Sequence, residues 1–224
     1  MIKGILFDYD GTLSARYIAA VRMYHHMIHK ISSKEYDPLE EETMVQQIMM
    51  WDEFGTMNKR YVMDNIKKNY FPDMDAAYWT DYWYAHFDEV QVTMPGSKEV
   101  LLELKKHYKL GILSNGESTS QHAKIKKLGL EDIFEQVIVS GDYHIDKPDV
   151  RIFQIAAERL GCKCEETAMV GDTFYRDITG AIRAGMYPVY YCYEKRCYTE
   201  YPVQQAADYN DIRHIFIDGR LWEN

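Results

Sequence analysis

The sequence predicts an α/β fold, in which a parallel sheet carries helices on both faces and a helical insertion follows the first strand. A short apolar run at residues 2–7 reads as a buried strand that ends in a glycine turn. From residue 15 to about 92 the pattern is helical, with almost no strand signal. Beyond residue 109 strands and helices alternate, as they do around a parallel sheet. A chain of 224 residues can bury one large core and also carry such an insertion.

Each predicted element has its own local pattern. Within the insertion, residues 17–31 and 41–50 show apolar residues at three- and four-residue spacing, which indicates helices. Pro95-Gly96 then ends the insertion. We predict later strands at 109–114, 136–139, 167–170 and 187–191, and helices at 97–107, 118–128, 149–160 and 175–184. We therefore expect an α/β core domain at 1–13 and 95–224, with a small helical-bundle cap domain at 14–94.

Composition narrows the classes of partner. A formal net charge of −9 argues against a protein that grips nucleic acid polymers, since that task needs clustered Lys and Arg. The apolar N-terminal run is too short for a signal peptide, and no segment has the length of a membrane span. The chain has four cysteines, which are too few and too unevenly spaced for a disulfide framework: Cys162, Cys164, Cys192 and Cys197. We expect a cytoplasmic protein, monomer or homodimer, with no membrane partner.

Two acidic pairs follow predicted strands. Asp8 and Asp10 come directly after the first strand, while Asp172 and Asp177 follow the strand at 167–170. The carboxyl ends of parallel strands share one edge of the sheet, so the two pairs would repel each other unless a cation lay between them. Hard oxygen ligands without neighbouring His or Cys suit Mg²⁺. Either pair alone could simply be a polar strand exit.

Two further polar segments reach the same edge. Ser114-Asn115-Gly116 ends the strand at 109–114, where its hydroxyl and backbone N–H groups could hold phosphate oxygens. Lys147 stands after the strand at 136–139 and can bring a positive charge to the same crevice. Taken singly, an ordinary turn and a solvated lysine are the alternatives.

Together these segments resemble the four motifs of the haloacid dehalogenase superfamily, in the family's order. Residues 8–13 are similar to the first motif and residues 113–116 to the second, while Lys147-Pro148 and residues 171–177 are similar to the third and fourth. The resemblance covers nearly the whole chain. It implies a Rossmann-like core with the inserted helical cap of subfamily I, and the second-motif region looks like that of the pyrimidine nucleotidase-like members.

The resemblance implies a phosphatase with Mg²⁺ as its cofactor. Asp8 would attack phosphorus, Asp10 would protonate the leaving oxygen and then activate water, and Lys147 would neutralise charge. The metal ligands would be Asp8 and Asp172 through their carboxylates and Asp10 through its backbone carbonyl. Asp177 would not bind the metal directly but would hold a ligand water or Lys147. The residues that bind phosphate would be Thr12, Ser114, Asn115 and Gly116. Thr12 would also orient Asp10.

The function we predict is Mg²⁺-dependent hydrolysis of a small phosphorylated metabolite through an aspartyl-phosphate, with a nucleoside monophosphate as the first substrate to consider. A phosphomutase and a sugar-phosphate or phosphoglycolate phosphatase remain alternatives. A 2-haloacid dehalogenase ranks below these because it needs neither a metal nor the acid/base residue at Asp10. A metabolite-binding protein without turnover would be expected to have lost a motif.

The insertion is rich in aromatic residues, and they cannot all fill its core. Around residues 78–84 they fall on more than one helical face. We therefore expect some of them to line the substrate crevice, where base stacking would favour nucleotides. The first candidates are Trp79, Tyr82 and Trp83.

Overall fold

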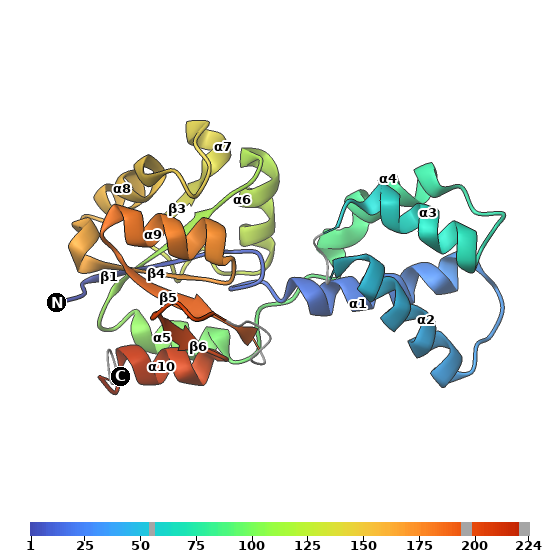
Figure 1. Cartoon of the computed structure of the whole chain (residues 1–224), viewed down its shortest axis with the longest axis horizontal. Coiled ribbons are helices and arrows are strands. Elements are labelled where there is room, and N and C mark those ends of the chain that lie inside the picture. The colour runs from blue at the N-terminus through green and yellow to red at the C-terminus, as the bar shows by residue number, and fades with distance from the viewer. Residues whose placement is uncertain (54–56, 194–198, 220–224) are drawn as a thin grey trace. The chain divides into compact units, whose positions relative to one another are not determined.

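The computed structural model describes residues 1–53, 57–193 and 199–219 (Figure 1). It divides the chain into two compact units, of which the first is Met1–Ser14 with Thr93–Asn224 and the second is Ala15–Val92. Cys197, one of the four cysteines considered above, lies outside the described residues. None of the helices in the described ranges is long and apolar enough to cross a bilayer.

The first unit is built on a parallel sheet that has six strands within the described residues, in the order β3-β2-β1-β4-β5-β6. The strands are β1 (Gly4–Phe7), β2 (Lys109–Ser114), β3 (Gln136–Val139), β4 (Thr167–Gly171), β5 (Tyr187–Tyr191) and β6 (Gln204–Ala206). β1 lies in the middle, and all four of its residues are buried. Its uninterrupted apolar run follows from this position, because a central parallel strand is covered on both faces.

Helices cover both faces of this sheet. They are α5 (Ser97–Leu104), α6 (Ser118–Lys127), α7 (Ser140–Tyr143), α8 (Val150–Arg159), the π-helical turn η4 (Phe174–Ile178), α9 (Thr179–Ala184) and α10 (Tyr209–Phe216), with a 3-10 turn η3 (Cys164–Glu166). Figure 1 shows α5 and α10 on one face and α8 and α9 on the other. On the second face Leu6, Leu113 and Met169 of the sheet share a core with Ile152 and Phe153 of α8.

The second unit is a helical bundle with its own core. It consists of α1 (Arg16–Ile31), α2 (Pro38–Trp51), α3 (Lys59–Asn69), α4 (Ala76–His86) and the 3-10 turn η2 (Phe87–Glu89). Asp37, Asn58 and Asp75 begin α2, α3 and α4, and each side chain accepts backbone N–H groups of the first turn. These caps explain why the helices start where they do.

The aromatic residues proposed for the crevice belong largely to this core. Trp79 and Trp83 are buried in it, and the ring of Trp83 lies 4.6 Å from that of Tyr24. Tyr82 packs against the same core from its edge and stacks on His86 at 3.9 Å. The interpretation of Trp79 and Trp83 as substrate contacts is therefore wrong, because the bundle uses both rings to fill its interior.

The predicted α/β class, with its parallel sheet and inserted helices, is confirmed. Two elements were not predicted from the sequence, namely β6 and α10, the last strand and the last helix of the described residues. β6 is only three residues long and polar in two of them, so it has no apolar run to detect. The predicted helix at 175–184 is instead a π-helical turn that leads into α9.

Candidate active site

The chemically active side chains expected from the sequence lie at the carboxyl edge of the sheet. β1 and β4 are neighbours, with Phe7 opposite Val170, so Asp8 and Asp172 follow adjacent strands. Ser114 is the last residue of β2, on the other side of β1. After β1 the chain builds β2 and β3 to one side and then β4, β5 and β6 to the other. Open α/β sheets bind ligands where the strand order changes direction in this way.

Three carboxylates converge at this point. One oxygen from each of Asp8, Asp172 and Asp177 lies within 4.8 Å of the others. Asp177 comes from the π-helical turn η4 and is fixed there, because its Oδ2 accepts the backbone N–H of Thr173 at 2.9 Å. A Cβ on Gly171 would lie 2.4 Å from that of Asp177, so the strand must end in glycine for this carboxylate to approach.

Lys147 lies buried between two of these carboxylates. Its Nζ donates to Oδ1 of Asp8 and to Oδ1 of Asp177, both at 2.6 Å, and to the carbonyl of Leu113 at 2.9 Å. These three acceptors match the three N–H bonds of an ammonium group. Burial acts to lower the pKa of Lys147, but the charges of Asp177 and Asp8 outweigh it and hold the pKa above its ordinary value. The lysine therefore remains charged.

The carboxylates outnumber this single ammonium. Burial raises the pKa of Asp8 to about 7 against the opposing charge of Lys147, and Asp177 adds to the increase. Burial and the charge of Asp8 also raise the pKa of Asp172 well above its ordinary value. A divalent cation among these oxygens would favour the ionised carboxylates, and oxygen donors alone are what Mg²⁺ accepts. The residues present fit a magnesium ion.

Asp10 and Ser114 are joined by a residue that the sequence analysis did not single out. Nε2 of Gln121, on α6, donates to Oδ2 of Asp10 at 2.9 Å and to Oγ of Ser114 at 2.7 Å. Gln121 is buried, and it reaches Asp10 although 111 positions separate the two residues in the sequence. One signal could have found it: Gln121 stands four residues before the buried Ile125, on the inward face of the helix.

The side chain of Asn115 points to the protein backbone. Its Oδ1 accepts the N–H of Lys147 at 2.9 Å, and its Nδ2 donates to the carbonyl of Lys147 at 3.1 Å. The backbone N–H of Gly116 donates to Oγ of Ser140 at 3.1 Å. The predicted phosphate-binding segment is therefore fastened to the loop that carries Lys147, and what Asn115 can offer a phosphate is its backbone.

The turn after β1 lies close to Asp172. Gly11 has φ +89, and a Cβ there would lie 2.2 Å from Oδ2 of Asp172, so only glycine fits. The hydroxyl of Thr12 donates to Oδ1 of Asp172 at 3.5 Å. Thr12 was predicted to orient Asp10, whereas the hydrogen bond observed for its hydroxyl is with Asp172. This turn therefore connects the two acidic pairs.

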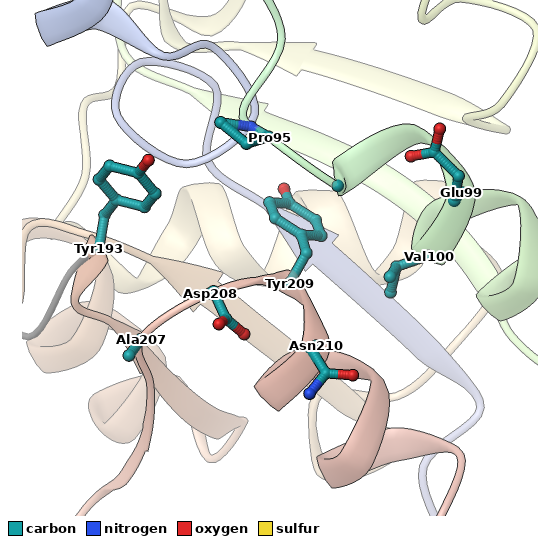
Figure 2. Close-up of a pocket in the computed structure, with 9 residues that line it drawn as sticks. Pro95, Glu99, Val100, Tyr193, Ala207, Asp208, Tyr209 and Asn210 are labelled. Atoms are coloured by element: carbon teal, nitrogen blue, oxygen red, sulfur yellow. The ribbon is translucent and has the colours of Figure 1, made fainter.

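Two of the cavities that open on the first unit adjoin the candidate site or the turn after β1. The smaller, about 530 Å³, lies beside the candidate site, with a lining of Asn115, Gly116, Ser140, Gly141, His144, Asp146 and Arg176. Figure 2 shows the larger, about 730 Å³, with Tyr193 and Tyr209 among the side chains that surround it. The buried hydroxyl of Tyr209 donates to the carbonyl of Thr12 at 3.0 Å, which ties this cavity wall to the turn after β1. No sequence signal pointed to Tyr209, because its helix was not predicted.

Comparisons with known proteins agree with this arrangement. The family model described as haloacid dehalogenase-like hydrolase matches residues 5–190. The glyceraldehyde 3-phosphate phosphatase of Pyrococcus furiosus is 32% identical over 213 residues, which cover 93% of this chain and 88% of that protein. The pyrimidine 5'-nucleotidase YjjG of Escherichia coli is 34% identical over 99 residues, which cover 44% of each chain.

Solved structures extend the likeness to the fold. The HAD-hydrolase YfnB from Bacillus subtilis, bound to magnesium, matches with a TM-score of 0.71 at 22% identity, over 96% of this chain and 99% of that one. The family match spans β1, β2 and β4, whose ends carry Asp8, Ser114 and Asp172. With the family model and a relative of near full length in agreement, the chain belongs to the haloacid dehalogenase-like hydrolase family.

Proposed function

We propose that this chain is a Mg²⁺-dependent phosphatase that hydrolyses a small phosphorylated metabolite through an aspartyl-phosphate on Asp8. The observation that carries the proposal is the buried cluster in which Lys147 bridges Asp8 and Asp177 beside Asp172. A phosphate ester is an anion, so its site must neutralise the transferring oxygens while it positions a nucleophile. The ammonium group and a place for a divalent cation meet the first need, and Asp8 meets the second.

The reaction has two steps on these side chains. In the first, a carboxylate oxygen of Asp8 bonds to phosphorus, the bond from phosphorus to the leaving oxygen breaks, and Asp10 gives its proton to that oxygen. In the second, Asp10 takes a proton from water, the water oxygen bonds to phosphorus, and Asp8 leaves as a carboxylate. Lys147 holds Oδ1 of Asp8 in place throughout. The hydroxyl of Ser114 and the backbone of Asn115 bind the transferring oxygens.

The ion would be held by the carboxylates of Asp8 and Asp172 and by the backbone carbonyl of Asp10. Bound there, Mg²⁺ supplies positive charge to the phosphoryl oxygens of the substrate. Asp177 supports the site from behind, because it accepts from both Lys147 and the backbone of Thr173. Its hydrogen bond fixes the lysine that faces Asp8.

Two substrate classes have support. The glyceraldehyde 3-phosphate phosphatase of Pyrococcus furiosus aligns over 93% of this chain, which favours a triose phosphate. The pyrimidine nucleotidase YjjG aligns over 44%, which keeps the nucleoside monophosphate of the sequence analysis as the second candidate. We propose that the second unit, Ala15–Val92, acts as a cap that selects between such leaving groups. Mg²⁺ as the cofactor and a cytoplasmic location belong to the same proposal.

One panel of assays tests the function. Purified protein is incubated with glyceraldehyde 3-phosphate, nucleoside monophosphates, sugar phosphates, phosphoglycolate and a 2-haloacid, with Mg²⁺ or with excess chelator. We expect phosphate release from at least one ester that disappears with chelator and returns with Mg²⁺, and no turnover by Asp8→Asn. Full activity in excess chelator, or turnover of the haloacid alone, would contradict the proposal. A new phosphate ester in place of free phosphate would identify a phosphomutase.

A further inference from the structure

Gln121 lies where it can control two groups of the candidate site at once. Helix α6 begins at Ser118 after its cap Glu117, and this start turns position 121 inward, with only 2% of Gln121 exposed. Nε2 then lies 2.9 Å from Oδ2 of Asp10 and 2.7 Å from Oγ of Ser114. Asp10 belongs to the turn after β1 and Ser114 to the end of β2, so the amide connects two strand ends.

The chemistry of the amide settles which way it faces. The nitrogen of Gln121 faces Asp10, where it can donate both to a carboxylate oxygen and to the carbonyl oxygen of the protonated acid. An amide nitrogen carries two N–H bonds, and here one points to Asp10 and the other to Ser114. Rotation of the amide group would break both bonds together. The orientation of Asp10 is thereby linked to that of Ser114.

The hydrogen bond also directs the proton of Ser114. Because Oγ accepts from Gln121, the hydroxyl proton must point away from that amide. The carbonyl of Asn115, at 3.4 Å, is a distant acceptor for it. The hydroxyl is therefore prepared to donate to an incoming oxygen, as a phosphoryl group would require.

Packing holds the side chain in this position. A Cβ on Gly116 would lie 3.0 Å from Cγ of Gln121 and 3.1 Å from its Cδ, so the aliphatic part of the glutamine rests against the segment that follows β2. One turn further along α6, Ile125 is buried as well. A long polar side chain that is packed on its stem and bonded at its tip loses little freedom when substrate binds.

We propose that Gln121 is a positioning residue that aims the acid/base carboxylate of Asp10 and the phosphate-binding hydroxyl of Ser114 at the same substrate. The inference rests on the proposed function, since it assigns Asp10 the protonation of the leaving oxygen. Its particular consequence concerns the leaving group. An alkyl phosphate needs that proton in the transition state, whereas p-nitrophenyl phosphate releases a stable phenolate and needs it far less.

The test compares these two substrates in Gln121→Met, which keeps the length of the side chain and removes its donors. We expect kcat/KM with Mg²⁺ to fall about 10²-fold for the alkyl phosphate, because displacements of about 1 Å cost that much, and about tenfold or less for p-nitrophenyl phosphate. Gln121→Glu keeps the shape but turns an acceptor toward Asp10, and it should show the same split. In an Asp10→Asn background, Gln121→Met should add no further split.

The matched control is Ile125→Val, which loosens the same buried face of α6 without touching Asp10 or Ser114. It should affect both substrates equally. If Gln121→Met and Gln121→Glu lower kcat/KM by the same factor for both substrates, as Ile125→Val should, the glutamine only packs and the inference is wrong. Wild-type protein with no Mg²⁺-dependent activity would overturn the proposed function as well, so the two failures are distinguishable.

Discussion

Lys147 and Asp172 have different relations to the charge at the site. Lys147 already holds its two carboxylates at 2.6 Å, while no lysine or arginine in the described residues forms an ion pair with Asp172 at the distances that define the others. Asp172 instead accepts a hydrogen bond from the hydroxyl of Thr12 at 3.5 Å. Of the acidic residues here, it is the one whose charge depends most on an added cation.

Removal of Asp172 should therefore affect metal binding more than removal of a phosphate-binding group does. We expect Asp172→Ala to weaken Mg²⁺ binding at least about tenfold, since loss even of a group that only supports a ligand costs 10–100-fold. Ser114→Ala should leave metal affinity within about twofold and raise KM for the substrate. Isothermal titration with MgCl₂ measures both, and equal losses of affinity would contradict the assignment.

Tyr209 gives a second prediction for a single residue. In Tyr209→Phe the fully buried carbonyl of Thr12 loses its donor, which should cost about 1–3 kcal/mol in the free energy of unfolding. The turn that carries Asp10 is then less well fixed, so kcat should fall too. Urea unfolding and steady-state kinetics provide the two measurements.

The chain contains a matched control for this substitution. The hydroxyl of Tyr108 donates to the carbonyl of Phe216 at 2.7 Å, a bond of the same chemistry between α10 and the segment before β2. Tyr108→Phe should lower stability but leave kcat unchanged. A normal kcat in Tyr209→Phe would show that its bond to Thr12 serves folding alone.

Single residues were predictable from the sequence where chemistry restricts the residue type. Asp8, Lys147 and Asp172 could be predicted because charged side chains at the ends of buried strands need partners of opposite charge. The structure brings the three residues together. Asn115 and Gln121 show the limit. Both are amides, and only packing decides that one clamps a backbone while the other faces a carboxylate. Such choices depend on neighbours distant in the sequence.

At the scale of elements, position within the sheet decided what could be predicted. β2, β3 and β5 have the predicted bounds because their residues are mostly apolar and at least half of each strand is buried. β6 pairs only with β5, at the edge of the described sheet, and its short polar sequence carries no such pattern. An edge strand of this kind is held largely by backbone pairing, which residues other than proline can make whatever their side chains.

The helical unit supplies a prediction about its core. Trp83 is 2% exposed and packs against Tyr24 and Phe87, so Trp83→Ala should lower the free energy of unfolding by about 3–5 kcal/mol. Any change in kcat/KM should be the same for a nucleotide and for p-nitrophenyl phosphate. Thermal unfolding and the two assays test this, with the exposed Tyr84→Ala as a control that should stay within about 0.5 kcal/mol. A loss confined to the nucleotide would restore Trp83 as a substrate contact.

For the whole molecule, the pKa values at the site predict how stability depends on pH. The folded state raises the pKa of Asp8 to about 7, so without metal it binds a proton that the unfolded chain releases near pH 4. Stability from this group is complete below about pH 4 and is lost as pH rises to about 7. Asp172, whose pKa is also raised, acts in the same direction. The contribution of these two carboxyl groups to the stability of the metal-free protein should therefore fall between about pH 4 and 7.

Magnesium should reverse this trend, because it binds the ionised carboxylates. We expect the increase in Tm on adding Mg²⁺ to be larger at pH 8 than at pH 5. In Asp8→Asn the fall in stability with pH should be smaller, since one of the responsible groups no longer titrates. Thermal scans with chelator and with Mg²⁺ across this range provide the measurement, and an equal shift at both pH values would contradict the expectation.

The two ends of the helical unit meet. Ser14 forms a bridge with Thr93, and the N–H of Ala15 donates to the carbonyl of Val92 at 2.9 Å. The 78 residues of this unit are therefore inserted into the chain at a single point of the first unit, and the pairing of β1 with β2 does not depend on their number. Such a segment could be replaced by another helical unit in the laboratory without a change in the strands of the core. With the role proposed for the helical unit, replacing it would change the substrate that the protein accepts and leave the acidic cluster of the core in place.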